Sequence, residues 1–378
     1  MTSNQLKRSI QSLADIRQVG KVAPVTPVLR FIIPSKSFGV KQIGGTSPIG
    51  NLSFGLAVSL LLLISVAAGQ QIDQAAVDEL PIRIVQENEG LESERVSIFV
   101  GSELFTAFVP ANHGRPILYP VYGPGQVSMT RHWPMADAPE GVVEAHDHPH
   151  HKSLWYGHEV NGVDFWTERS GKIEVKNYQI DPTANSLEVN SEWIRNADSQ
   201  IVCRDRVVYR FDGDSKKRWV DVTITFFADD LAVTLDDTKE GFFAIRTHPH
   251  LRLSPAPREG VNQVFGKAIN SEGDIDKQVW GKRARWLLYY GPVQGNSVGI
   301  AIFDHPENLR HPTTWHARDY GLIAANPFAL HEMLNKPRGS GDYRIDPSSS
   351  LSLRYRMVFI GGEVDSEFVE SLYQEFSK

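Results

Sequence analysis

The chain has only one cysteine, Cys203, among its 378 residues. It therefore cannot form an intrachain disulfide or a thiolate-rich zinc site, so any metal ion would be held by histidine and carboxylate side chains. The sequence also has no glycine-rich phosphate loop, no G-x-S-x-G nucleophile elbow and no H-E-x-x-H helix. These absences argue against a nucleotide cofactor, serine hydrolysis and zincin-type proteolysis.

Acidic residues are scarce in one part of the chain only. Residues 1–69 contain seven of the 39 basic residues but one of the 45 acidic residues, followed by an apolar run over 54–68 and then small residues. This order is typical of a secretory signal, and the run is shorter than the roughly 20 residues of a membrane span. We predict that 1–69 is an N-terminal extension with a signal peptide cut after Ala68 or Gly69, and that the protein is exported to the periplasm or beyond. An uncleaved anchor is the alternative.

Without that segment the formal charge falls from −6 to about −12, because the segment carries a net charge of +6. Such an acidic chain argues against nucleic acid and anionic membranes as partners. We expect a small-molecule or glycan substrate, and no membrane span after signal cleavage.

Apolar residues alternate with polar ones from Arg95 onward, which predicts antiparallel strands. The strand-like runs are 96–100, 173–178, 202–211, 219–227, 231–235, 242–253, 286–290, 298–303 and 351–360. We interpret 70–92 as a lead-in segment and 93–378 as a single, mainly β domain, a large β-sandwich. One amphipathic helix should begin at Asp365 or Ser366, with an apolar stripe formed by Phe368, Val369, Leu372, Tyr373 and Phe376. Long loops over 110–171 and 304–345 are expected to be functional.

The densest group of titratable side chains lies between residues 146 and 158, where five histidines occur. In an extended backbone His148 and His150 would point to one side, and His151 to the other. Histidine transfers protons near neutral pH and also ligates metals. Two uses therefore stay open, proton transfer or a divalent transition metal, although no cofactor is certain. The candidate metal ligands are His146, His148, His150 and Glu159.

Two further clusters combine histidine with groups that suit a polar ligand. Trp315 and Tyr320 offer flat faces to a sugar ring, and Arg318 could orient hydroxyl or acid groups. Arg246 and His248 should share a strand face. Core packing of the aromatic rings and a local ion pair between Arg318 and Asp319 are the alternatives.

Four strings within residues 95–376 resemble the DUF6807 family, also labelled PmoA-like or "methane oxygenase PmoA". They are DHPHHKSLWYGHEVNGVDFW (147–166), NSEG (270–273), WGKRARW (280–286) and FDHPENLRHPTTWHARDYGLIAANPF (303–328). The resemblance implies a sandwich of the galactose-mutarotase type in an exported protein of polysaccharide-degrading bacteria, while the label itself implies an oxygenase subunit. The resemblance assigns no catalytic residues.

We therefore predict an exported enzyme that acts on a carbohydrate or related polyhydroxylated substrate by histidine and carboxylate acid–base chemistry, of lyase, isomerase or glycoside-hydrolase type. The predicted catalytic residues are His150, His248, His316, Glu272 and Asp319. The predicted substrate-binding residues are Arg131, Trp155, Asn161, Asp164, Trp166, Arg246, Lys282, Trp315, Arg318 and Tyr320. The clusters are expected to converge on one site. A metal-dependent oxidoreductase and a non-catalytic glycan-binding module are the alternatives.

Overall fold

The computed structural model of the chain describes residues 80–87 and 94–378. The predicted extension, signal peptide and cleavage site lie outside these residues. In the described part of the chain, no helix has the length and apolar character needed to cross a membrane.

Eight antiparallel strands form a sheet that we call sheet A. In spatial order they are β1 (Ile82–Glu87), β2 (Arg95–Val100), β3 (Glu103–Asn112), β4 (Arg115–Val121), β5 (Leu154–Gly157), β13 (Phe242–Arg246), β18 (Leu322–Asn326) and β17 (Thr314–Arg318). The last four strands of this order, from β5 to β17, come from distant parts of the sequence. The sheet therefore brings together the segments around residues 155, 245, 325 and 315.

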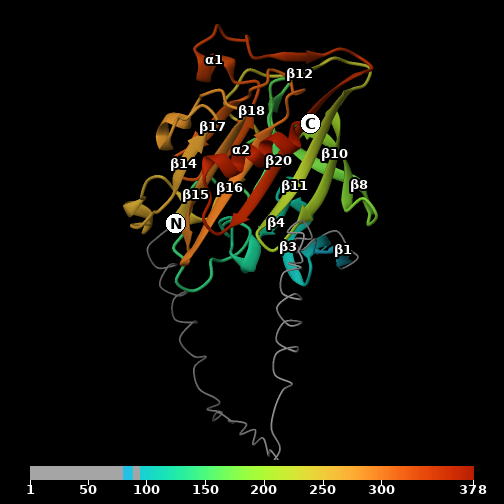
Figure 1. Cartoon of the computed structure of the whole chain (residues 1–378). Coiled ribbons are helices and arrows are strands. Elements are labelled where there is room, and N and C mark those ends of the chain that lie inside the picture. The colour runs from blue at the N-terminus through green and yellow to red at the C-terminus, as the bar shows by residue number, and fades with distance from the viewer. Residues whose placement is uncertain (1–79, 88–93) are drawn as a thin grey trace, which may run out of the picture. The chain divides into compact units, whose positions relative to one another are not determined.

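A second antiparallel sheet, sheet B, has eight strands, most of them longer than those of sheet A (Figure 1). In spatial order they are β14 (Lys267–Asn270), β15 (Trp286–Val293), β16 (Asn296–Asp304), β20 (Ser349–Gly361), β11 (Lys217–Ala228), β10 (Ile201–Gly213), β9 (Ser186–Arg195) and β8 (Gly171–Asp181). A small third sheet contains β19 (Tyr343–Ile345), β12 (Val233–Leu235), β6 (Glu159–Val160) and β7 (Val163–Asp164).

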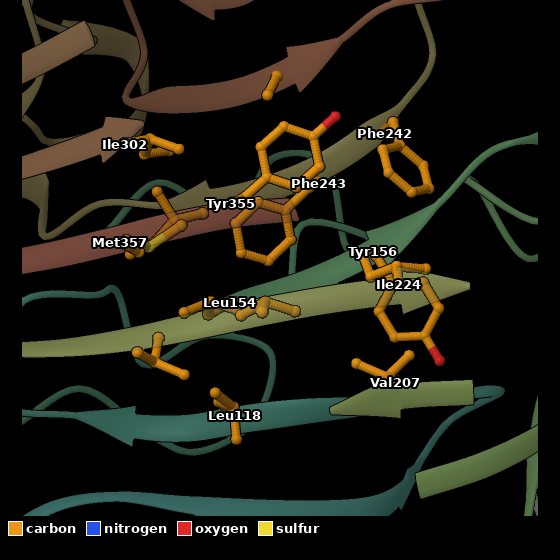
Figure 2. Close-up of a cluster of buried hydrophobic side chains, with 14 of the residues drawn as sticks. Leu118, Leu154, Tyr156, Val207, Ile224, Phe242, Phe243, Ile302, Tyr355 and Met357 are labelled. Atoms are coloured by element: carbon orange, nitrogen blue, oxygen red, sulfur yellow. The ribbon is translucent and has the colours of Figure 1, made fainter. Parts of the chain in front are cut away.

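Sheets A and B bury a common apolar core. Leu118 and Leu154 of sheet A and Val207, Ile224 and Met357 of sheet B belong to one cluster of buried side chains, and Figure 2 shows them pointing into the same space. Along β10, and along β20 as far as Tyr355, every second residue is buried, because successive side chains of a strand point to opposite faces. Beyond Tyr355 both faces of β20 are buried, since Val358 and Ile360 cluster with residues of the C-terminal helix. The predicted mainly β sandwich is therefore confirmed.

The C-terminal helix α2 (Ser366–Phe376) begins where the sequence predicts, since the Asp365 carboxylate accepts a hydrogen bond from the N–H of Phe368 at 2.8 Å. Val369, Leu372 and Tyr373 pack against sheet B, over β15 and β16 (Figure 1). Phe368, assigned to the apolar stripe, is instead 39% exposed. The remaining helices are short: α1 (Leu330–Leu334), η1 (Pro124–Gln126), η2 (Pro249–Leu251), η3 (Pro257–Glu259) and η4 (Asp276–Val279).

Several strands lie where the sequence pattern indicates none. Strand β1 falls inside the lead-in 70–92, and the two long loops contain β4 to β7 and β17 to β19. All residues of β5, β13 and β18 are buried, because both faces of sheet A are covered there. Strands covered on both faces lose the apolar–polar alternation that a sequence pattern detects. The covered second face of sheet A carries the candidate site.

Candidate functional site

The register of sheet A places two alanines between two functional side chains. Trp155 pairs with Ala244, Ala244 with Ala324, and Ala324 with His316, so these four residues form a row across four strands. The neighbouring row, which includes Tyr156 and Phe243, points into the core instead. The row of Trp155 and His316 therefore lies on the second face, and its small central side chains leave room above them.

Trp166 occupies that room. It clusters with Trp155, Ala244 and Ala324, and its ring centroid lies 5.3 Å from that of Trp155 and 6.5 Å from that of His316. Its side chain is fully buried. The indole therefore packs as a layer between the sheet and the loops above it, and its ring face is not free to stack on a sugar.

The segment that carries Trp166 is held by a buried ion cluster that we call the Glu168 triad (Arg115, Lys152 and Glu168). Lys152 Nζ lies 2.6 and 2.7 Å from the two Glu168 carboxylate oxygens, and Arg115 donates to the same carboxylate. Arg115 also donates to the backbone carbonyls of Phe165 and Trp166. These bonds fix the position of the loop, because a guanidinium offers several donors in a rigid arrangement.

A second ion cluster, the Asp147 triad (Arg131, Asp147 and Arg246), holds the histidine-rich loop. Asp147 Oδ1 lies 2.7 Å from Arg131 Nη1 and 2.6 Å from Arg246 Nη2, and both arginines are 2% exposed. Burial alone would raise the pKa of Asp147, but the His148 hydrogen bond and the charges of Arg246 and Arg131 bring it well below its usual value. Arg131 also donates to the carbonyls of His148 and His151, which anchors the loop backbone.

Three histidines of this loop come together because the backbone turns between them. His148 has a φ of 46°, and the N–H of His151 donates to the carbonyl of His148 at 3.0 Å. The His151 ring lies 4.8 Å from the His148 ring and 4.4 Å from the His150 ring, measured between centroids. The prediction that His151 points away from the other two was wrong, because it assumed an extended backbone.

These elements enclose a pocket of about 430 Å³. It is lined by His148, His150, His151, Asp164, Thr167, Arg169, Lys239, Glu240, His316, Arg318 and Tyr320. Two of the three predicted clusters, around residues 150 and 316, therefore meet at one site. A larger pocket of about 640 Å³ lies at β1 and β8, but no histidine lines it, so we place the candidate site at the smaller pocket.

Two of the lining histidines are neutral at physiological pH. Burial and, after it, the charge of Arg115 lower the pKa of His150 to about 3. Burial likewise lowers the pKa of His316 to about 3, with Arg318 and Lys239 acting in the same direction.

His151 is held as one defined tautomer. Arg246 Nη1 lies 3.0 Å from His151 Nδ1, and a guanidinium can only donate, so Nδ1 accepts and the ring proton resides on Nε2. Burial and the charge of Arg246 bring the pKa of His151 well below its usual value. His151 is therefore a neutral group that can donate a hydrogen bond through Nε2 and cannot act as a base at Nδ1.

Six residues predicted from the sequence line the pocket, namely His148, His150, Asp164, His316, Arg318 and Tyr320. Four more, Arg131, Trp155, Trp166 and Arg246, lie directly behind its wall and support it. Arg246 and Arg318 lie near the face of Tyr320, with guanidinium carbons 4.7 and 5.6 Å from the ring centroid. The substrate-contact roles predicted for Trp155 and Trp166 are replaced by supporting roles.

The three remaining predicted catalytic residues do not line this pocket. His248 stacks edge-on with His250 at 4.8 Å, and its Nδ1 accepts from the backbone N–H of His250. Glu272 accepts from Ser271 on an exposed turn. Asp319 follows the end of β17 and pairs with Lys277 at 3.0 Å. Each of the three is close in sequence to a residue of the pocket or of a predicted motif, but its own side chain is not part of the pocket lining.

Other predicted residues have structural partners elsewhere. Asn161, in the turn between β6 and β7, accepts from the N–H of Thr234 on β12, and Lys282 is exposed. Trp315 belongs to the sandwich core, where its Nε1 donates to the Ala284 carbonyl at 3.0 Å. It faces the core because its neighbour His316 takes the site-facing position on β17.

The four suggested metal ligands do not converge. His146 is exposed and stacks on Trp133 at 5.0 Å, while Glu159 lies on β6 in the third sheet. Within residues 80–87 and 94–378, no three His, Cys, Asp or Glu side chains are arranged to hold a metal ion.

Five lining residues were not among the predicted site residues: His151, Thr167, Arg169, Lys239 and Glu240. The pair Lys239–Glu240 precedes β13 and has the composition of any solvated turn. Thr167 bonds the Asp164 carboxylate through its N–H at 2.8 Å and its hydroxyl, a local contact that no spacing pattern reveals.

The chain belongs to the DUF6807 family, described as a family of unknown function, whose sequence profile matches residues 95–374. This finding confirms the resemblance seen in the four strings. No curated protein sequence matches the chain.

Solved structures with a similar arrangement share little sequence. An α-galactosidase from Lactobacillus brevis is 9% identical over 76% of this chain and 40% of its own length, with a TM-score of 0.35. A galactose mutarotase-like protein from Clostridium acetobutylicum is 10% identical over 75% of this chain and 99% of its own, with a TM-score of 0.32. A glycoside hydrolase family 97 enzyme from Pseudoalteromonas sp. strain K8 is 12% identical over 79% of this chain and 38% of its own length, with a TM-score of 0.30.

The buried neutral His316 should make stability depend on pH. Its pKa is about 3 in the folded chain and about 6.5 when unfolded, so between these values the unfolded chain binds the extra proton. The free energy of unfolding should therefore fall as the pH drops through this window. Urea unfolding at several pH values should give a shallower slope for His316→Gln, by up to about 1.4 kcal/mol per pH unit. Equal slopes in both proteins would contradict a buried neutral imidazole.

Proposed function

We propose that this protein is an exported enzyme that acts on a carbohydrate or related polyhydroxylated substrate, with His150 and His316 as the proton-transfer groups. The observation that carries the proposal is that both histidines, each with a pKa lowered to about 3, line one pocket together with charged hydrogen-bonding groups. Both imidazoles are neutral at pH 7 and so present a free lone pair, and an anionic substrate bound beside them would raise their pKa towards neutrality, the range in which a general base works best. Asp164, Arg318 and Tyr320 offer both donors and acceptors for hydroxyl groups.

The charges in the pocket favour an anionic transition state. Glycoside hydrolysis passes through a cationic, oxocarbenium-like transition state and commonly uses two carboxylates as acid, base or nucleophile. Here Asp164 accepts from Thr167, Glu240 pairs with Lys239 at 3.0 Å, and Arg169 and Arg318 add positive charge. Positive groups stabilise an enolate-like species formed when a base removes a proton beside a carbonyl. We therefore favour an isomerase or lyase over a hydrolase.

His151 completes the proposed chemistry as a hydrogen-bond donor. Its Nε2 proton is fixed by the Arg246 contact at Nδ1, and no described group accepts from it. A neutral donor of this kind can polarise a substrate carbonyl, while His150 or His316 removes the proton.

Export is part of the proposal and is supported by the basic and apolar pattern of residues 1–69. Expression of the full chain in a bacterium, followed by N-terminal sequencing of the periplasmic and medium fractions, should find a mature chain that begins at Gly69 or Gln70. A protein that stays uncleaved in the membrane or cell interior would contradict this part.

The catalytic assignment is tested by replacing the two histidines separately. Wild-type protein is screened by proton NMR against aldoses, ketoses, uronic acids and oligosaccharides for any chemical change. His150→Ala and His316→Gln should then lower kcat by about 100-fold or more, the usual effect of losing a proton-transfer group. His146→Gln is the matched control, because its ring is exposed and does not line the pocket.

Unchanged turnover in both histidine variants would contradict the assignment. If a glycan binds without turnover in the wild type, and the variants weaken only that binding, the glycan-binding alternative replaces the enzyme.

A further inference from the structure

The lining of the candidate pocket has a small excess of basic residues, although the chain as a whole is acidic, with a formal charge of −6. Its lining contains three basic residues, Arg169, Lys239 and Arg318, against two acidic ones, Asp164 and Glu240. Buried neutral histidines add no charge. The excess is therefore local and runs against the charge of the whole chain.

The two triads behind the pocket wall add to this excess. In each, two basic side chains share a single carboxylate: Arg131 and Arg246 share Asp147, while Arg115 and Lys152 share Glu168. Each triad thus has one basic group more than it has carboxylates. The next carboxylates are Glu144 near Arg131 and Asp164 near Arg115, whose charges act on the two arginines without forming a salt bridge. A buried charge that is only partly compensated costs free energy, and an anionic ligand in the neighbouring pocket would lower that cost.

The pKa values of two lining histidines reflect this positive charge. After burial, Arg115 is the largest contribution to the lowered pKa of His150, and Arg246 to that of His151. In the same region Arg115 Nη1, Arg131 Nε and the indole N–H groups of Trp155 and Trp166 are buried without a hydrogen-bond partner in the described part of the chain, as are the Nδ1 atoms of His148 and His316, which can donate or accept. Donors in excess of acceptors suit a ligand that only accepts.

The rim of the pocket provides the groups that reach such a ligand. Lys239 is neutralised by Glu240 and Glu332, each at 3.0 Å. Among the described residues, by contrast, no carboxylate lies within salt-bridge distance of Arg169 or Arg318. Both guanidiniums line the pocket and keep their donors available.

We infer that the pocket binds an acidic sugar, a uronate whose carboxylate pairs with Arg318 and Arg169 at the pocket rim. The inference rests on the proposed function in taking the same pocket as the substrate site. A planar carboxylate matches the fork of donors on a guanidinium. A phosphorylated sugar fits less well, because phosphate sites are commonly built from glycine-rich loops and helix N-termini, and no residue that lines this pocket is a glycine or belongs to an α-helix.

Isothermal titration calorimetry with the purified full-length protein at low salt tests the inference. The probes are D-glucuronate and D-galacturonate, each compared with its neutral parent, D-glucose or D-galactose. At least one uronate should bind about tenfold or more tightly than its neutral parent, which is the effect of one charge-assisted hydrogen bond. Arg318→Gln and Arg169→Gln should each reduce that ratio. Arg206→Gln, an exposed arginine on β10 outside the pocket, should preserve it.

Equal binding of uronate and neutral sugar, or no uronate binding, overturns the inference, as does tighter binding of D-glucose 6-phosphate than of either uronate. The proposed function can fail separately. A uronate that binds through Arg318 without turnover keeps this inference and contradicts the enzyme. If the protein instead turns over a neutral sugar in a reaction that depends on His150 and His316, and shows no preference for a uronate, the proposed enzyme is kept and this inference is contradicted.

Discussion

Two buried clusters in which a single carboxylate holds two basic side chains organise the candidate site. The Asp147 triad ties the histidine-rich loop to β13 through Arg246, with contacts of 2.6 and 2.7 Å. The Glu168 triad ties the Trp166 segment to β4 through Arg115. Breaking such a buried ion pair leaves an uncompensated charge and is strongly destabilising, so both loops are held firmly on the second face of sheet A. The same arrangement keeps surplus positive charge beside the pocket.

Burial and nearby positive charge together determine the charge state of the histidines. The pKa of His150 and of His316 is lowered to about 3, so both rings are neutral over the physiological range, and an anionic substrate beside them would raise their pKa towards neutrality, where a histidine transfers protons well. The Arg246 contact at Nδ1 gives His151 the opposite role, that of a fixed donor. Three histidines in one pocket therefore have different roles, and these differences come from the groups that surround each ring. An anionic substrate, or an anionic transition state, is what this combination stabilises best.

Much of the fold, and part of the site, can be predicted from the sequence. Strand β10, which is buried on one face, alternates in sequence, as does β20 as far as Tyr355, and the Asp365 cap marks the start of α2. Strand β13 lies within the predicted run 242–253, but β5 and β18 fall in segments interpreted as loops, because the site covers their second face and removes the alternation. His150 and His316 are identifiable from the density of histidines. Lys239 and Glu240 line the pocket only because of the tertiary packing, which no local pattern reveals. Glu272 and His248 have side chains suited to acid–base catalysis but lie outside the pocket lining.

The most direct test of the central claim, that burial reinforced by nearby positive charge keeps these histidines neutral and fixes their roles, is long-range proton–nitrogen NMR of the histidine rings at about pH 5.5. The account predicts that His150, His151 and His316 are all neutral at this pH, and that His151 carries its proton on Nε2. Doubly protonated rings at His150 and His316, or a proton on Nδ1 of His151, would contradict it.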